Sequence, residues 1–546
     1  MLTVKIKNII HFFKEKGQAF FLLLLCFYSV ILHFFWLRLD RTPPWGNGIP
    51  SILRGIYFFQ MQGEWSFWEF IKEMSIGYNI KQMSIGLDST YPPLVDFSYF
   101  VYYKLFGLSS EMDLMVNSIY LIIGIVGVYG IGKNLFNKNT GLFSALIFAS
   151  FPGVLLCSKS GFKEFQVMCF IALAIYFLLE SRNFTNRKFS LLFGISAGLM
   201  MMVKYEAIIF LIVPLTIVFA RIVVNKNILK NNALPWIINL MLSLIIVILI
   251  GFPWYILSWR NFLEHMLYRA DSAGMGDIYF STKELTYYFH TLDSELLTVT
   301  YGVLFLAIYV YSLLKMLNPK TMTIGIKRIV LLCFYFTFPF LFFSFLSGKS
   351  FAHICPLLVF ASVIIAGGIS IIRNRFVRFI FICLIFFHAI SLPLMWLSTA
   401  VKDNWNFKLK EIIQFIKEDY YGPNLKDYSG TKKPFVLVLV NDGPLRYHQI
   451  QYYNMKEYLP IELVERYGEN VKPEEDIFGS KYEYILSEIP TNFIHPKEDD
   501  SIKELLKFID DNTERFFKNY VVACEIEVPR SSKVIIYKRV NDDVNK

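Results

Sequence analysis

Long runs of apolar side chains are the feature of this 546-residue sequence that most limits how it can fold. A helix of about 20 apolar residues crosses a bilayer, where only helices and closed barrels satisfy all their backbone hydrogen bonds. Apolar residues make up 55% of the chain and charged residues 18%, whereas roughly 25% are charged in soluble domains. The sequence therefore predicts a polytopic α-helical membrane protein.

Eleven segments are apolar and long enough to be membrane spans. We expect them near residues 18–37, 113–132, 141–157, 165–181, 189–203, 207–224, 235–257, 299–315, 328–347, 355–372 and 378–399. The first is longer than a signal-peptide core and no small-residue cleavage site follows it, so we interpret it as an uncleaved anchor.

The basic residues between these segments predict the orientation. If the N-terminus is cytoplasmic, the short outer loops hold only Lys159, Lys163, Lys204 and Lys349. The inner loops then hold 19 basic residues, namely Lys5, Lys7, Lys14, Lys16, Lys133, Lys138, Arg182, Arg187, Lys188, Arg221, Lys226, Lys230, Lys315, Lys320, Lys327, Arg328, Arg373, Arg375 and Arg378. Short cytoplasmic loops are enriched in Lys and Arg, so we predict a plasma-membrane protein with its N-terminus inside. This explains the net charge of +10 without a nucleic-acid partner.

Two long outer loops follow from this orientation, at about 38–112 and 258–298. The apolar stretch Tyr91–Phe106 lies in the first, and counting it as a span would reverse every later loop. It is short and begins with two prolines, so we expect an interfacial or re-entrant helix on the outer face. Residues 63–74 mix Trp and Phe with charges and predict a second interfacial helix.

The composition changes at residue 400, and residues 400–546 read as a soluble α/β domain outside the cell, following a membrane domain at 1–399. We expect strands at 433–442, 482–486 and 533–537 and an amphipathic helix at 501–511. None of the seven cysteines forms a CxxC pair, so the sequence favours neither a zinc site nor a disulfide framework.

Three patches in the outer regions carry a family resemblance. They are LDRTPPWGNGIPSILRGIYFF (39–59), YPPLVDFSYFVYYKLFG (91–107) and the paired spans with their basic loop at 164–207. In this order they resemble the GT-C fold glycosyltransferases, specifically bacterial relatives of protein O-mannosyltransferases and aminoarabinose transferases. The segment SGKSFAHICPLLVF (347–360) resembles a later lysine-and-proline segment of that family.

The resemblance implies inverting transfer of a sugar from a polyprenyl-phosphate donor to a glycan, lipid or protein acceptor at the outer face. Such chemistry needs a carboxylate that takes the proton of the acceptor hydroxyl. It also needs fixed cations that stabilise the departing lipid phosphate. Some members of the family use a divalent metal; the resemblance leaves this open, and no ligand cluster in the sequence identifies a metal site.

The sequence departs from the family pattern after Pro43-Pro44. Relatives usually carry an acidic pair there, whereas this chain has Gly46-Asn47. Asn47 can orient an acceptor but cannot act as a base. The candidate catalytic carboxylates are therefore Asp40, Asp88 and Glu164. Their non-catalytic alternatives are an interfacial ion pair with Arg41, a turn residue, and a helix N-terminal charge, respectively.

Six residues are candidates for binding the substrate or the donor phosphate: Asn47, Tyr91, Lys204, Arg269, Lys349 and His353. Lys204 matches a lysine that the family carries at that turn; its alternative role is a salt bridge to Glu206 or contact with lipid headgroups. For His353 the alternative is a structural role, and for Arg269 a solvated loop.

Two other function classes remain open. The missing acidic pair favours a catalytically silent relative that binds lipid-linked glycan or organises other envelope enzymes. A transporter would have ionisable residues at mid-membrane, helix breaks and repeated halves; the sequence shows few such charges and no repeat.

Overall fold

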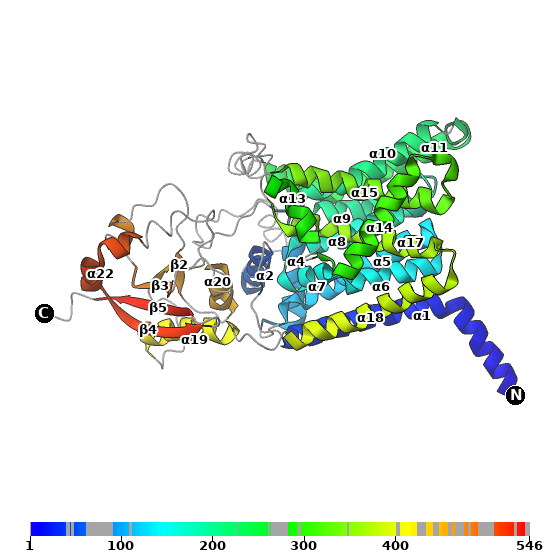
Figure 1. Cartoon of the computed structure of the whole chain (residues 1–546). Helices are drawn as coiled ribbons and strands as arrows, with labels where there is room; N and C mark the ends of the chain where they lie inside the picture. Colours follow the sequence, from blue (N-terminus) through cyan, green and yellow to red (C-terminus); the bar gives the residue numbers. More distant parts are fainter. Residues whose placement is uncertain are drawn as a thin grey trace.

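The computed structural model describes residues 2–39, 44, 48–61, 91–108, 112–224, 226–259, 263, 282–292, 296–346, 349–399, 405–422, 433–439, 447–456, 461–464, 474–478, 482–489, 507–528 and 532–540. A large bundle of long helices forms one part of the molecule, and a smaller unit of strands and helices from the C-terminal chain forms the other (Figure 1).

Twelve described helices make up most of the bundle. They are α1 (Leu2–Leu39), α5 (Asn117–Leu135), α6 (Lys138–Ser150), α7 (Pro152–Ser160), α8 (Lys163–Glu180), α9 (Arg187–Met201), α10 (Ile209–Val224), α11 (Lys226–Leu257), α14 (Val299–Met316), α15 (Ile324–Phe345), α17 (Leu358–Ile371) and α18 (Arg375–Thr399). The span that contains α17 is 89% buried, whereas the spans of α14 and α18 are each 22% buried. The core therefore lies around α17, α5, α6 and α8, and the outer helices present apolar side chains to the bilayer.

Eight of the described helices are long and apolar enough to cross a membrane. A ninth span results if α6 and α7, which meet at a 55° bend, are counted as one. All nine coincide with predicted spans. The remaining two predictions, 165–181 and 189–203, correspond to α8 and α9. These two helices are not among the candidate spans, because α8 carries three charged residues in its 18 and α9 has only 15 residues. The multi-pass membrane architecture is thus confirmed.

Close contact between α5 and α8 fixes the position of α8 in the bundle. A Cβ atom added to Gly127 would lie 2.5 Å from the carbonyl carbon of Ala172, and one added to Gly130 would lie 2.2 Å from the ring of Tyr176. Only glycine allows two helices to approach this closely. The backbone of α8 is therefore held firmly against the core.

Two short helices lie at the end of the bundle that faces the C-terminal unit (Figure 1): α2 (Ile49–Met61) and α4 (Leu94–Phe106). They pack against each other. Pro93 precedes α4, and Gly107, at φ +74°, ends it. Helix α4 is the predicted non-spanning helix and does not appear among the candidate spans. The helix predicted at 63–74 lies outside the described residues.

The C-terminal unit contains a five-stranded sheet in the order β2-β1-β3-β5-β4. Its strands are β1 (Phe435–Leu439), β2 (Glu462–Val464), β3 (Tyr484–Ile489), β4 (Tyr520–Val528) and β5 (Ser532–Arg539). Strands β2, β1 and β3 are parallel, and β5 and β4 are antiparallel to their neighbours. The three predicted strands correspond to β1, β3 and β5. Sequence reasoning did not identify β2 or β4.

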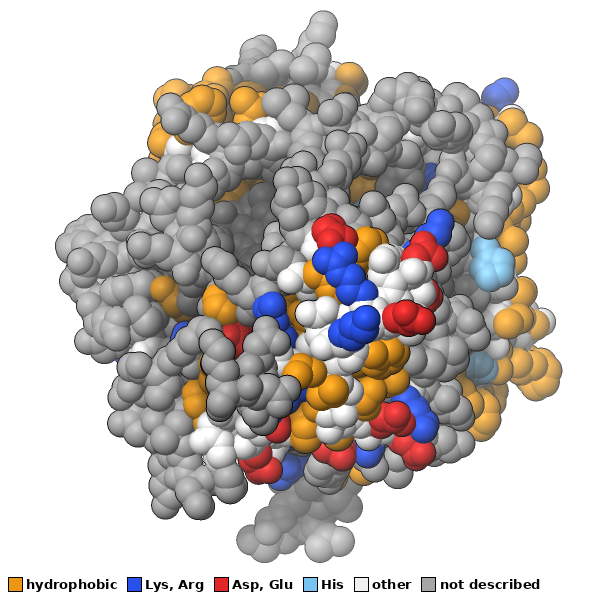
Figure 2. Space-filling view, turned by 90° about the vertical axis from the view of Figure 1, so that its left-hand side faces the viewer, with side chains coloured by type: hydrophobic (Ala, Val, Ile, Leu, Met, Phe, Trp, Pro, Cys, Tyr) orange, Lys and Arg blue, Asp and Glu red, His pale blue; other side chains and the backbone are white. Residues whose placement is uncertain are grey.

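Helices α19 (Trp405–Tyr421), α20 (Tyr447–Lys456) and α22 (Thr513–Asn519) accompany the sheet. Seen from this end, the described surface mixes Lys and Arg with Asp and Glu (Figure 2), as expected for a face in water.

Helix α20 joins the C-terminal unit to the bundle. It packs on α2, and the side chain of Gln60 donates a 2.8 Å hydrogen bond to the carbonyl of Met455. The hydroxyl of Tyr452 donates to the buried carboxylate of Asp113, which precedes α5. The unit is therefore docked on the same end of the bundle as α2 and α4.

Candidate active site

The turn between α7 and α8 places two ionisable side chains inside the protein. Gly161, at φ +81°, ends α7 in the left-handed region, and α8 begins two residues later at Lys163. Lys163 and Glu164 are 1% and 3% exposed. A carboxylate in the first turn of a helix is stabilised by the helix dipole, yet burial this deep also requires a charged partner.

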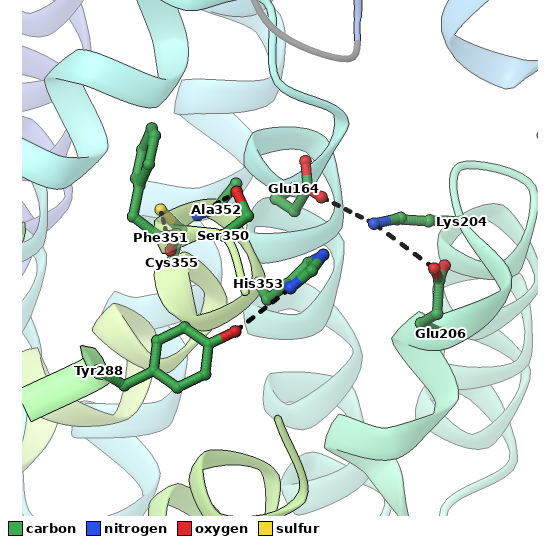
Figure 3. Close-up of polar contacts among 9 residues, drawn as sticks. All are labelled: Glu164, Lys204, Glu206, Tyr288, Ser350, Phe351, Ala352, His353 and Cys355. Carbon is green, nitrogen blue, oxygen red and sulfur yellow. Dashed lines mark hydrogen bonds and ion pairs between the residues drawn. The ribbon is translucent and has the colours of Figure 1, made fainter. Parts of the chain in front are cut away.

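Lys204 is the partner of Glu164. It lies between α9 and the 3-10 helix η3 (Tyr205–Ile208) in an extended conformation. Its Nζ atom is 2.7 Å from Oε1 of Glu164 and 3.6 Å from Oε1 of Glu206 (Figure 3). The alternative prediction of a salt bridge to Glu206 is thus confirmed, but the shorter and more buried contact is with Glu164.

Burial alone would favour the neutral form of Lys204. The carboxylates of Glu164 and Glu206 outweigh this desolvation and raise the pKa of Lys204 above its ordinary value. These contacts favour the charged form of Lys204, whose ammonium group faces the carboxylates of Glu164 and Glu206.

His353 approaches the same carboxylate from another part of the chain. It lies in α16 (Phe351–Ile354), whose N-cap is Ser350. Its Nδ1 atom is 3.3 Å from the hydroxyl of Tyr288, which belongs to α13 (Thr282–Thr291), and its ring stacks on Phe343. A positive charge on His353 would stabilise the carboxylate of Glu164. Figure 3 shows Glu164, Lys204, Glu206 and His353 gathered in one region.

Tyr91 connects the first long loop to this cluster. Its ring stacks on Tyr205 at 5.8 Å between ring centroids, while the Nζ atoms of Lys163 and Lys204 lie 4.2 and 5.5 Å from its centroid. Such cation–π contacts hold the two ammonium groups beside one ring. The amide of Leu94 also donates to the carbonyl of Met202, so the start of α4 is tied to the loop that carries Lys204.

Lys349 lies at the edge of the cluster. Its Nζ atom donates to the carbonyls of Ser344 and Leu346 at the C-terminal end of α15 and sits 5.4 Å from the ring centroid of Tyr288. These bonds satisfy carbonyls at a helix end. Lys349 therefore supports the partner of His353 in this structure.

Four of the predicted site residues lie outside the described residues: Asp40, Asn47, Asp88 and Arg269. Gly48, which follows Asn47, is described. A Cβ atom on Gly48 would lie 1.4 Å from the carbonyl oxygen of Gly161. Gly48, near the beginning of the first long loop, therefore contacts the turn at Gly161 that precedes Glu164.

Sequence reasoning missed Lys163 as a site residue and missed a second buried ion pair. Arg54 of α2 contacts Asp96 of α4 through Nε at 3.0 Å and Nη2 at 3.2 Å, and both side chains are buried. The available signal was an aspartate in the first turn of a mostly apolar 13-residue helix. This pair fastens α2 to α4 and lies within electrostatic range of Lys163.

Within the described ranges, no group of three or more His, Cys, Asp or Glu side chains could hold a metal ion.

Residues 90–252 match the family model for dolichyl-phosphate-mannose-protein mannosyltransferase. This stretch includes Tyr91, Lys163, Glu164 and Lys204. No curated protein matches this sequence.

Solved structures resemble nearly the whole chain. ArnT from Cupriavidus metallidurans, bound to undecaprenyl phosphate, matches with a TM-score of 0.62 at 12% identity, covering 96% of this chain and 99% of ArnT. This chain has the GT-C glycosyltransferase fold. The GT-C resemblance predicted from the sequence is confirmed.

Two further GT-C structures are similar. AglB, the oligosaccharyltransferase of Archaeoglobus fulgidus, in complex with an inhibitory peptide and a dolichol-phosphate, matches with a TM-score of 0.52 at 12% identity over 98% of this chain and 75% of AglB. The mycobacterial arabinofuranosyltransferase AftD matches with a TM-score of 0.53 at 13% identity, over 96% of this chain and 40% of AftD. At these identities, the likeness establishes the GT-C fold.

Proposed function

We propose that this GT-C protein transfers a sugar from a polyprenyl-phosphate donor to an acceptor at the outer face of the plasma membrane. The observation that carries the proposal is the buried Glu164–Lys204 pair beside His353, at the end of the bundle where α2 and α4 pack. Buried charges are expensive, so a cluster of this kind in a membrane protein marks a functional site.

The leaving group of the reaction is a lipid phosphate, and the lysines are suited to it. Lys204 and Lys163 both lie near the ring of Tyr91, and both side chains are buried. Fixed ammonium groups in a site with little water stabilise negative charge that develops on a departing phosphate. The apolar walls of the bundle accommodate the isoprenoid chain. ArnT and AglB, which share the fold, have been seen with undecaprenyl phosphate and dolichol-phosphate. Arg269, Lys349 and His353 remain further proposed contacts of the donor phosphate.

Glu164 is the proposed base. In this structure its carboxylate lies 2.7 Å from the ammonium group of Lys204. A donor phosphate would compete for Lys204, and Glu164 would then be free to accept the proton of the acceptor hydroxyl. Attack on the sugar from the side opposite the phosphate gives inversion. Asp40 and Asp88 are the alternative bases, and Asn47 would orient the acceptor.

This mechanism requires the site to lie outside the cytoplasm. We propose eleven spans, with α8 and α9 among them, a cytoplasmic N-terminus, and residues 400–546 outside. Cys524 lies in the C-terminal sheet and is partly exposed, so it is a native reporter. A membrane-impermeant maleimide should label Cys524 in intact cells and should not label the Cys524→Ser variant at that peptide. Labelling of Cys524 only after permeabilisation would contradict the orientation.

The activity is tested with the protein in membranes and a panel of radiolabelled polyprenyl-phosphate sugars. We expect transfer of label from one of them, and loss of transfer when Asp40→Asn and Glu164→Gln are combined. Transfer that survives the double substitution would contradict the catalytic assignment. Binding of the lipid phosphate without transfer from any donor would favour the alternative, a catalytically silent relative. The absence of a carboxylate at Gly46-Asn47 supports that alternative.

A further inference from the structure

Two cysteines that lie far apart in the sequence meet beside the site. The Sγ atoms of Cys157 and Cys355 are 2.9 Å apart, although 198 positions separate the residues. Both side chains are 0% exposed. Cys157 belongs to α7, and Cys355 begins the 3-10 helix η6 (Cys355–Leu357).

The fold brings the helices that carry these two cysteines into contact. Helix α7 begins at Pro152, where the chain bends by 55° away from α6, and this bend brings α7 against η6. The thiol of Cys355 also lies 3.5 Å from a carbonyl of its own turn, that of Phe351. No metal-binding group of three ligands occurs in the part of the chain that the structure describes, which disfavours a metal thiolate centre.

We propose that Cys157 and Cys355 form a disulfide bond that fastens α7 to η6. An S–S bond is about 2.05 Å long, so the sulfurs need to approach by less than about 1 Å, which small side-chain rotations supply. Cys169 on α8 is also near Cys157, but the close contact of Cys157 is with Cys355.

The bond would hold the two halves of the candidate site together. Cys157 is followed through Gly161 by Glu164, and Cys355 follows His353 by two residues; Figure 3 shows Cys355 next to His353. These segments are 198 positions apart in the sequence. A covalent link between them limits how far His353 can move from the carboxylate that it faces.

The oxidant is a protein disulfide of a thiol oxidase. The thiolate of one cysteine attacks that disulfide to give a mixed disulfide, and the second thiolate then displaces the oxidase. The two thiols lose two protons and two electrons, and the oxidase leaves as a dithiol. Because the pair is fully buried, the exchange takes place before the helices close around it. It rests on the outward orientation proposed above, since cytosolic thiols are kept reduced.

Peptide mapping of the wild-type protein tests the bond directly. Cells are quenched in acid, the membranes are alkylated with N-ethylmaleimide in denaturant, and the protein is digested without reduction. We expect a linked pair of peptides containing Cys157 and Cys355, with Cys169 and Cys333 alkylated. Recovery of Cys157 and Cys355 as alkylated thiols would overturn the proposal.

Thermal unfolding with matched variants provides the second readout. In a slow temperature scan a reductant reaches the sulfurs once the helices begin to open. It should therefore lower the apparent melting temperature of the wild type and of Cys169→Ser by a few degrees, because it releases a long closed loop. It should have no effect on Cys157→Ser. A wild-type transition that ignores the reductant would overturn the fastening role. Neither measurement uses sugar transfer, so failure of the proposed enzyme activity would not be mistaken for failure of the disulfide.

Discussion

Substitution of Glu164 by Gln distinguishes the roles of the two carboxylates that contact Lys204. Glu164 and Glu206 both face the ammonium group, at 2.7 and 3.6 Å. The Gln side chain keeps nearly the same shape as Glu but cannot accept a proton from an acceptor hydroxyl. Glu206→Gln is the matched control, because it removes the same charge from the same lysine.

Distance alone barely distinguishes the two pairs. At an effective dielectric constant of roughly 20, Coulomb's law gives an attraction of about 6 kcal/mol at 2.7 Å and about 5 kcal/mol at 3.6 Å. The difference lies in burial and hydrogen bonding. The Glu164 side chain is 4% exposed and hydrogen-bonds to Lys204, whereas the Glu206 side chain is 22% exposed. Solvent therefore screens the Glu206 pair more strongly, and Glu164 has the stronger interaction with Lys204.

We expect Glu164→Gln to lower sugar transfer by about 10²- to 10⁴-fold, the usual contribution of a general base, which raises the barrier by about 2.7–5.4 kcal/mol. Glu206→Gln should stay within about tenfold of the wild type. The assay is transfer of label from a polyprenyl-phosphate sugar in membranes, normalised to the amount of folded protein. Equal losses in both variants, or a loss only in Glu206→Gln, would refute this assignment.

Three further substitutions test other parts of the account. Lys204→Met leaves Glu164 buried without its partner, so we expect a destabilisation of about 3–5 kcal/mol, measured as a fall in melting temperature. Glu164→Gln combined with Lys204→Met should recover part of this stability. A double variant whose loss of stability equals the sum of the two single losses would contradict the pairing. Asp96→Asn should destabilise the protein by a similar amount, because it leaves Arg54 buried without a countercharge. Its control is Glu525→Gln, which breaks the exposed pair with Lys533 and should cost less than about 1 kcal/mol. Thermal unfolding of the two variants side by side tests this difference, and equal losses of stability would contradict it. Lys163→Gln should weaken binding of undecaprenyl phosphate with little effect on binding of undecaprenol, and a uniform loss for both lipids would point to a packing defect instead.

Hydropathy and loop charge predicted the helices of the bundle, because span length and apolar composition are properties of local sequence. They also separated α4 from the spans, since its prolines, its shortness and the charge parity all favoured a non-spanning helix. The strands β1, β3 and β5 were found because each is a short apolar run. Strand β4 alternates Cys524, Glu525, Ile526 and Glu527, and its charged residues concealed it.

The site was predicted only in part. Glu164, Lys204, Tyr91 and His353 could be nominated from their place in outer loops and from a family pattern. Their pairing could not, because residues 164, 204 and 353 meet only through the packing of α8, η3 and α16. Lys163 escaped notice since a lysine in a short loop between spans looks like a headgroup contact. Likewise, the meeting of Cys157 with Cys355 depends on the bend at Pro152, which no spacing rule for cysteines describes.

Binding of undecaprenyl phosphate to the purified protein in detergent tests the central claim most directly, because it needs no knowledge of the sugar or the acceptor. Native mass spectrometry against undecaprenol, which has the same isoprenoid chain and no phosphate, isolates the contribution of the charged cluster. The account predicts that the wild type retains the phosphate lipid at least tenfold better than the alcohol, and that Lys204→Met loses this preference. Equal retention of the two lipids by the wild type, or an unchanged preference in Lys204→Met, would contradict it.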